Sequence, residues 1–259
     1  MNLLTQIRNR NTLLYQIALF HIVLAGITAL LMMVDTTQVA GVNRWIKPFK
    51  FDVSVSIYLL TIAWLSAYLP TNWIRKISLQ IAICLLIEII LIHLQAARGV
   101  KSHFNRESID GGIIYAIMGI FILYNTVLVV LITIKFFKIK FDLPPLYLKG
   151  IRFGLLSFLL GSFLAMYMSS SPGHTVGAPD GGAGLPFLNW STTVGDLRVM
   201  HFLGIHGLQL FILLGAYLSR PNNQSSRNIF ILNGLFLVFI GMVIATFIQA
   251  LLAKPFISL

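Results

Sequence analysis

Charged side chains are scarce in this sequence. Asp, Glu, Lys and Arg make up 10% of its 259 residues, whereas a water-soluble domain carries roughly a quarter charged residues. Hydrophobic residues account for 57% of the chain. A chain of this composition has too few polar side chains to cover its core in water, so we expect lipid to solvate it.

Several sequence motifs are also missing. The single cysteine, Cys84, excludes an intramolecular disulfide. The chain has no phosphate-binding loop, nucleophile elbow or dinucleotide fingerprint in a supporting context. It has neither the Cys-x-x-Cys-His of covalent haem attachment nor the His-Glu-x-x-His of zinc proteases, and no internal repeat like those of inverted-repeat transporters. No enzyme class is indicated by a motif.

Seven long apolar runs are present instead. Crossing an apolar layer about 30 Å thick takes about 20 helical residues. The runs are Thr12–Val34, Phe51–Leu69, Ile77–Ala96, Gly112–Phe137, Ile151–Met168, Val199–Ser219 and Asn228–Ala253. They do not alternate in polarity as barrel strands do, so the sequence predicts an all-α, polytopic bundle of about seven transmembrane helices. We interpret the first run as a retained helix and not a cleaved signal.

The net charge of +11 would indicate nucleic acid in a soluble protein. Here Lys and Arg gather near the ends of the apolar runs, so we expect the lipid bilayer and not a nucleic acid as partner. The basic N-terminus and the dense cluster from Lys135 to Arg152 favour the cytoplasmic side. We therefore expect an N-terminus inside, a C-terminus outside and a multi-pass protein of the bacterial plasma (inner) membrane.

The chain is predicted to form a single membrane domain, 1–259, with one long outward loop, 169–198. Its glycines and prolines argue against regular structure, and Asp180-Gly181 is a strong turn signal. Leu185, Phe187 and Trp190 favour folding back onto the bundle. A connection of this length is usually functional or disordered, and we expect a lid.

A second segment, Asn43–Asp52, mixes aromatic and cationic residues just ahead of the second run. It is typical of an interfacial anchor, in which Asp52 caps the helix N-terminus. The alternative is a cationic patch at the mouth of an outward-facing site.

A carboxylate, Glu88, lies far from both ends of the third run. At 100° per residue Glu88 and Gln95 share one helix face, whereas His93 lies about 140° round from Glu88. An intramembrane carboxylate indicates a functional or paired group. The structural alternative is a neutral Glu88 bonded to a neighbouring helix.

The histidines form the strongest candidate site. Five of the six lie on the predicted outward side: His93, His103, His174, His201 and His206. His93 with either His201 or His206 is predicted to bind haem b, iron or copper, because neutral imidazole ligates these groups. Arg98 and Arg198 would then hold propionates or another anion.

Two functions follow from these residues. The first is a membrane redox protein that binds haem or a metal and acts on a small or lipid-soluble substrate. The second is a small-molecule carrier or sensor with an outward-facing cavity and no cofactor, in which Glu88 and the histidines change protonation. Further candidate residues for either site are Gln95, His103, His174, Asp180, Asp196 and Gln209. Gly154, Gly161, Gly204 and Gly207 predict close helix packing.

Overall fold

The computed structural model describes residues 2–106, 108–220 and 226–258. Among them, seven helices are long and apolar enough to cross a membrane: α2 (Thr12–Val34), α3 (Ile46–Ser66), α4 (Thr71–Ala97), α5 (Ile109–Lys138), α6 (Pro145–Ser170), α7 (Leu197–Leu218) and α8 (Ser226–Leu251). The predicted all-α, polytopic architecture is confirmed, and the protein is an integral, multi-pass membrane protein. The first span has its predicted bounds, whereas α3 begins at Ile46 and not at Phe51.

A short additional helix, α1 (Leu3–Arg10), precedes the first span. The side chains of Asn2 and Asn11 accept hydrogen bonds from the backbone at the starts of α1 and α2, which satisfies N–H groups that have no partner inside a helix. The Arg10 guanidinium lies 3.5 Å from the Trp64 ring centroid and donates to the Trp64 carbonyl at 2.8 Å. These contacts fasten α1 to the end of α3.

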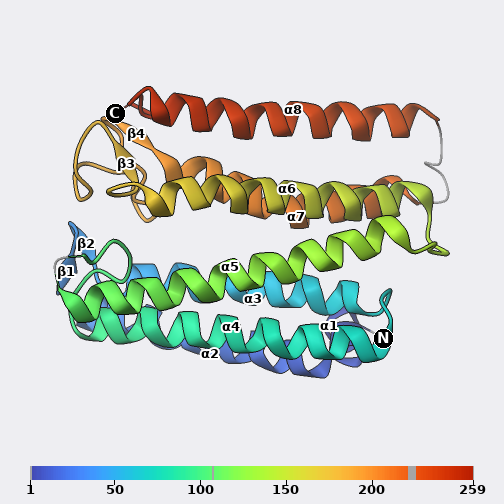
Figure 1. Cartoon of the computed structure of the whole chain (residues 1–259), viewed down its shortest axis with the longest axis horizontal. Coiled ribbons are helices and arrows are strands. Elements are labelled where there is room, and N and C mark those ends of the chain that lie inside the picture. The colour runs from blue at the N-terminus through green and yellow to red at the C-terminus, as the bar shows by residue number, and fades with distance from the viewer. Residues whose placement is uncertain (1, 107, 221–225, 259) are drawn as a thin grey trace. The chain divides into compact units, whose positions relative to one another are not determined.

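The chain divides into two compact units, and the division falls within α5, between Leu128 and Val129. The first unit contains α1 to α4 and the first part of α5. In Figure 1, α2, α3 and α4 run side by side. Strand β1 (Gln38–Val39) pairs with β2 (Val42–Asn43) to form a small antiparallel hairpin before α3.

This hairpin is joined to the end of α4 through Asp35 and Arg44. The backbone N–H of Thr37, the Trp45 indole and the Arg44 guanidinium all donate to the Asp35 carboxylate. Those hydrogen bonds, that of Thr37 first, hold the pKa of Asp35 well below its usual range. Arg44 also donates to the carbonyl of Ala97 at 3.0 Å. The start of α3 is therefore held against the end of α4.

The second unit is built on the close packing of α6 against α7 (Figure 1). A methyl group added to Gly204 would lie 2.4 Å from Cα of Gly161, nearer than any real side chain approaches a backbone. Ser157 donates to the carbonyl of Gly204 at 2.9 Å. The predicted close approach at the glycines is confirmed, since Gly154 and Gly207 are also crowded by α7 or α6. Helix α8 packs beside this pair.

Residues 171–196 connect α6 to α7 and fold back onto the second unit. Strand β3 (Thr175–Val176) pairs with β4 (Gly195–Asp196). Val176 packs against the apolar cluster formed by α7 and α8. The ring centroid of Trp190 lies 5.5 Å from that of Phe202 and 6.0 Å from that of Phe256. The predicted folding back of the long loop is confirmed, although its first and last two residues belong to α6 and α7. Its role as a lid stays a prediction.

Candidate functional site

A buried group of three ionisable side chains lies in the first unit, and we call it the buried triad: His21 of α2, Asp52 of α3 and His93 of α4. Nδ1 of His21 lies 2.9 Å from Oδ1 of Asp52. Nε2 of His93 lies 3.2 Å from Oδ2 of the same carboxylate. The side chains of His21 and Asp52 have no exposed surface, and that of His93 is 21% exposed. One carboxylate therefore links three membrane-spanning helices.

The position of Asp52 corrects its predicted role as a helix cap. Helix α3 begins one turn earlier than expected, so Asp52 lies inside the helix, about 9 Å from its first residue at 1.5 Å per residue. The sequence analysis missed both Asp52 and His21 as site residues. If the start of α3 had been predicted at Ile46, Asp52 would have stood out as a charged residue in the second turn of an apolar helix.

The contacts of the two ring nitrogens of His93 indicate how many protons this part of the buried triad carries. Nδ1 of His93 lies 2.9 Å from the carbonyl oxygen of Ile89, and a carbonyl can only accept, so Nδ1 carries a hydrogen. Nε2 faces the Asp52 carboxylate, in ionic range but without the alignment of a full hydrogen bond. This contact is attractive only with one proton between the two groups. An imidazolium beside a carboxylate and a neutral imidazole beside a carboxylic acid both meet this condition.

At the other end of the buried triad, Nε2 of His21 is buried and has no hydrogen-bond partner among the described residues. An unpaired polar atom in such a place costs about 1–3 kcal/mol. A structure usually retains such a cost where the group has a function or meets a bound water. His21 therefore presents an open hydrogen-bonding position inside the bundle.

Glu88 forms a second polar cluster in the first unit, together with the connection between α4 and α5, residues 98–108. Glu88 is 4% exposed, and its Oε1 lies 3.6 Å from Nε2 of His103. The His103 ring contacts the rings of Phe51 and Tyr115, at centroid distances of 5.7 and 5.9 Å. The predicted outer loop thus places an imidazole against the buried carboxylate.

Gln95 and Arg98, at the end of α4, bind to protein groups. Oε1 of Gln95 accepts a hydrogen bond from Arg98 at 2.9 Å, and Arg98 also pairs with Asp110 at the start of α5. Arg98 was predicted to clamp a propionate or another anion. In this structure its guanidinium ties the end of α4 to the start of α5.

The remaining predicted histidines lie in the second unit. Nδ1 of His201 lies 3.3 Å from the carbonyl of Gly161, which makes it a donor across the α6–α7 contact. The His206 ring packs on Phe202 at 4.5 Å, and Gln209 is its hydrogen-bond partner. His93 belongs to the first unit, and His201 and His206 belong to the second. Its pairing with His201 or His206 on one iron therefore stays a prediction.

Two carboxylates organise the connection 171–196. Asp180 accepts from the backbone and side chains of His174 and Thr175, at 2.6 to 3.1 Å. Burial alone would raise the pKa of Asp180, but these hydrogen bonds outweigh it and hold the pKa well below its usual range. Asp196 accepts from the N–H of Ser191 and from Arg198. These four predicted residues, His174, Asp180, Asp196 and Arg198, stabilise the connection itself.

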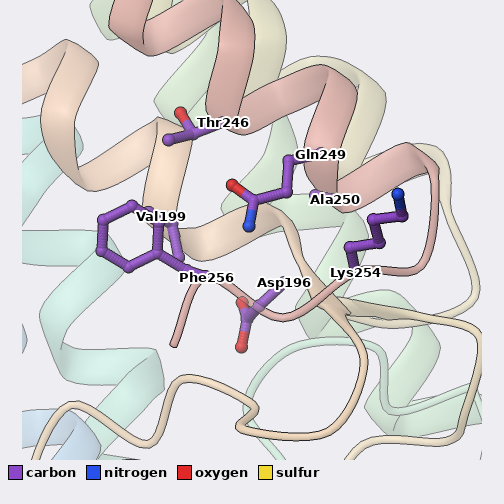
Figure 2. A pocket seen from close by; sticks show the side chains of 7 residues that line it. All are labelled: Asp196, Val199, Thr246, Gln249, Ala250, Lys254 and Phe256. Atoms are coloured by element: carbon purple, nitrogen blue, oxygen red, sulfur yellow. The ribbon is translucent and has the colours of Figure 1, made fainter. Parts of the chain in front are cut away.

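A shallow pocket adjoins Asp196, and Figure 2 shows its lining from β4, α7, α8 and the C-terminal segment. Its empty volume is about 140 Å³, well below the roughly 300–1,000 Å³ of ordinary ligand sites. The carboxylate of Asp196 is already bonded to Ser191 and Arg198. We therefore do not regard this pocket as a ligand site.

Within the described ranges, no three or more His, Cys, Asp or Glu side chains are arranged to hold a metal ion. The buried triad does not fit such an ion in the present arrangement, since one nitrogen of His93 donates to Ile89 and the other faces Asp52. The chain matches no protein-family model, no curated protein and no solved structure. The two polar clusters of the first unit are therefore its candidate functional features.

Proposed function

We propose that this membrane protein is a carrier or sensor for a small molecule, and that its working cycle takes up and releases a proton at the buried triad. The observation that supports this proposal is the Asp52 carboxylate, fully buried between two imidazoles of different helices. Ionisable groups inside a membrane bundle are costly, and they recur in proton relays and substrate pathways.

The proton count of the contact between Asp52 and His93 gives this proposal its chemistry. With one proton between them, the pair has no net charge and can remain buried. Removing that proton would leave a carboxylate in an apolar bundle, which costs several kcal/mol unless the helices move or a cation enters. Deprotonation therefore favours a different helix arrangement, and this is the coupling that a carrier or sensor requires.

His21 supplies the other side of the proposed path. Nδ1 of His21 contacts Asp52 and can take a proton from it when the ring hydrogen is on Nε2, and the open Nε2 position then suits a water or a substrate acceptor. His93 is the partly exposed member of the buried triad. A proton entering at His93 can thus be passed to Asp52 and, through its second oxygen, to His21.

The orientation of the protein in the membrane belongs to the same proposal. The N-terminus lies in the cytoplasm, because Arg8, Arg10, Arg75 and Lys76 flank the ends that would face inward. The connections 98–108 and 171–196 then face outward, as does the more accessible end of the buried triad. The membrane is the plasma membrane of a bacterium.

Infrared difference spectroscopy of the purified protein tests the proposal. Spectra at about pH 5 and about pH 8 bracket the ordinary titration of histidine. We expect carboxyl and imidazole bands that change with pH, disappear in Asp52→Asn and are altered in His93→Gln. The matched control is Asp180→Asn, which removes a carboxylate–histidine pair outside the spans. Identical difference spectra for the wild type and Asp52→Asn would overturn the proposal.

The alternative function, a redox protein that holds haem b or a metal at His93 with His201 or His206, is tested by the visible absorption spectrum and metal analysis. Stoichiometric haem lost in His93→Ala would favour it. The hydrogen bonds that His93 and Arg98 already form favour the cofactor-free carrier.

A further inference from the structure

Residues 98–106, the described part of the connection between α4 and α5, bring the His103 side chain, which is 21% exposed, against the bundle. Ser102 and Asn105 are buried, and the imidazole of His103 lies against Glu88 of α4. Nδ1 of His103 lies 3.1 Å from the Ser102 hydroxyl. A connection between two helices does not need a loop imidazole packed against a buried carboxylate. This contact therefore indicates a role beyond joining α4 to α5.

The surroundings of the His103 ring are those of a site for a small organic cation. Phe51 of α3 and Tyr115 of α5 each contribute an aromatic ring in contact with the imidazole, and Glu88 contributes a carboxylate. Aromatic faces and a carboxylate are the groups that recognise organic ammonium ions. Oε2 of Glu88 is buried and has no hydrogen-bond partner among the described residues. The site therefore has an acceptor that His103 does not use.

The backbone beside His103 is strained. Phe104 has a φ of 58°, a left-handed conformation that costs a residue with a Cβ roughly 1–2 kcal/mol. Docking of His103 therefore works against local strain, which lowers the free-energy cost of withdrawing it. Strained positions of this kind recur at ligand clamps and switches.

Charge balance determines how another cation could enter. Lys47 interacts electrostatically with Glu88 and lies 5.8 Å from the Phe51 ring centroid, and Arg106 lies 5.8 Å from that of Tyr115. With these two cations already present, a cation added beside a protonated His103 would be repelled. A cation that replaces the protonated imidazolium of His103 leaves the charge of the site unchanged. The ligand must then resemble imidazolium in size and charge.

We propose that Glu88, Phe51 and Tyr115 form a binding site for a small organic cation, such as a protonated nitrogen heterocycle, and that His103 occupies this site as a tethered internal ligand. The inference rests on the proposed function only in treating this ligand as the carried or sensed molecule. Binding itself is tested without transport and without the buried triad.

Imidazole is the probe, and the melting temperature of the purified full-length protein is the readout. A tethered group acts at an effective concentration in the mM range, so free imidazole competes poorly with His103 in the wild type. In His103→Ala the site is vacated, and we expect imidazole at tens of mM to raise the melting temperature by several degrees. The wild type should shift little.

His174→Ala is the matched control, because it removes another loop imidazole that is paired with a carboxylate, Asp180, in the second unit. It should not respond to imidazole. His103→Ala combined with Glu88→Gln should lose the response. Equal shifts in His103→Ala and His174→Ala, or a full shift in the double variant, would overturn the proposal.

If His103→Ala fails to fold, the same variant is produced and extracted with imidazole present. Recovery of folded protein under these conditions, and not with equal sodium chloride, supports the site. Failure of this rescue overturns it. Neither result bears on the infrared bands of Asp52, so failure of the cation site and failure of the proton-coupled function remain distinguishable.

Discussion

The Asp52 carboxylate and the His21 imidazole lie 2.9 Å apart, and neither side chain reaches the surface of the protein. Because neither side chain is exposed, bulk water cannot replace a lost partner of this contact. Loss of this contact should therefore lower the free energy of unfolding of the protein.

A double-mutant cycle on this pair is expected to show strong coupling. Asp52→Asn and His21→Gln should each destabilise the protein, and their interaction energy should reach about 1 kcal/mol or more, because each leaves the other group buried and poorly paired. The neutral buried pair of Tyr58 and Asn125, 3.2 Å apart, is the comparison. Its coupling should be about 0.6 kcal/mol, the average for side-chain hydrogen bonds in membranes. Unfolding in denaturant measures both cycles, and equal coupling would show that Asp52 carries no charge-dependent role.

The α6–α7 contact should tolerate no added volume. Gly204→Ala would place a methyl group 2.4 Å from the Gly161 backbone, so we expect a loss of about 1–3 kcal/mol and a lower melting temperature. Gly241→Ala in α8 is the matched control, since nothing lies within 4 Å of a methyl group added there. It should be neutral or slightly stabilising, because Ala favours helix more than Gly. A similar loss at both positions would mean that the two helices are not so close.

Asp180→Asn should destabilise the protein in a pH-dependent way. The pKa of Asp180 is lowered by the hydrogen bonds from His174 and Thr175, so its contribution is fully present above the ordinary Asp range. That contribution is lost as the pH falls through the lowered pKa. At neutral pH we expect a loss on the order of 1 kcal/mol, which shrinks as the pH is lowered below about 4. A difference in melting temperature that stays constant with pH would contradict this assignment.

Single cysteines in a Cys84→Ala background should report the two ends of α6. Lys140, before α6, and Ala178, after it, are both exposed. Because α6 is long and apolar enough to cross the membrane, the two positions should react with a membrane-impermeant thiol reagent from opposite sides. The proposed orientation expects Ala178→Cys to react from outside. Labelling of both from the same side would remove α6 from the spans.

The seven spans were predictable because each needs only a long apolar run, and such runs are read directly from the sequence. The buried triad was not predictable, for two physical reasons. The start of α3 depends on the hairpin held by Asp35 and Arg44, which no local pattern reveals. The meeting of His21 with Asp52 depends on how α2 and α3 are rotated against each other, and tertiary packing sets this rotation.

Glu88 was recognisable from the sequence, but its neighbour was not. Its isolation in an apolar run predicted a paired or functional carboxylate, and the structure places its Oε1 3.6 Å from Nε2 of His103, while a functional role stays a prediction. The partner was missed, because His103 lies in a connection that was expected to remain outside the bundle. Gly99, with a φ of 69°, and Phe104, with a φ of 58°, have left-handed conformations that help to shape this connection, and neither is evident from the sequence.

The amides of the connection 171–196 should behave unlike those of an ordinary loop in hydrogen exchange. Asp180 takes hydrogen bonds from the N–H groups of His174 and Thr175, and Asp196 takes them from Ser191 and Arg198. Amide protons held on carboxylates exchange with solvent only when the bond opens. Deuterium uptake should therefore be slow at both ends of a segment with almost no helix or sheet. Hydrogen bonds to two side-chain carboxylates should thus slow the local opening of this long connection, as backbone hydrogen bonds between strands do in a sheet.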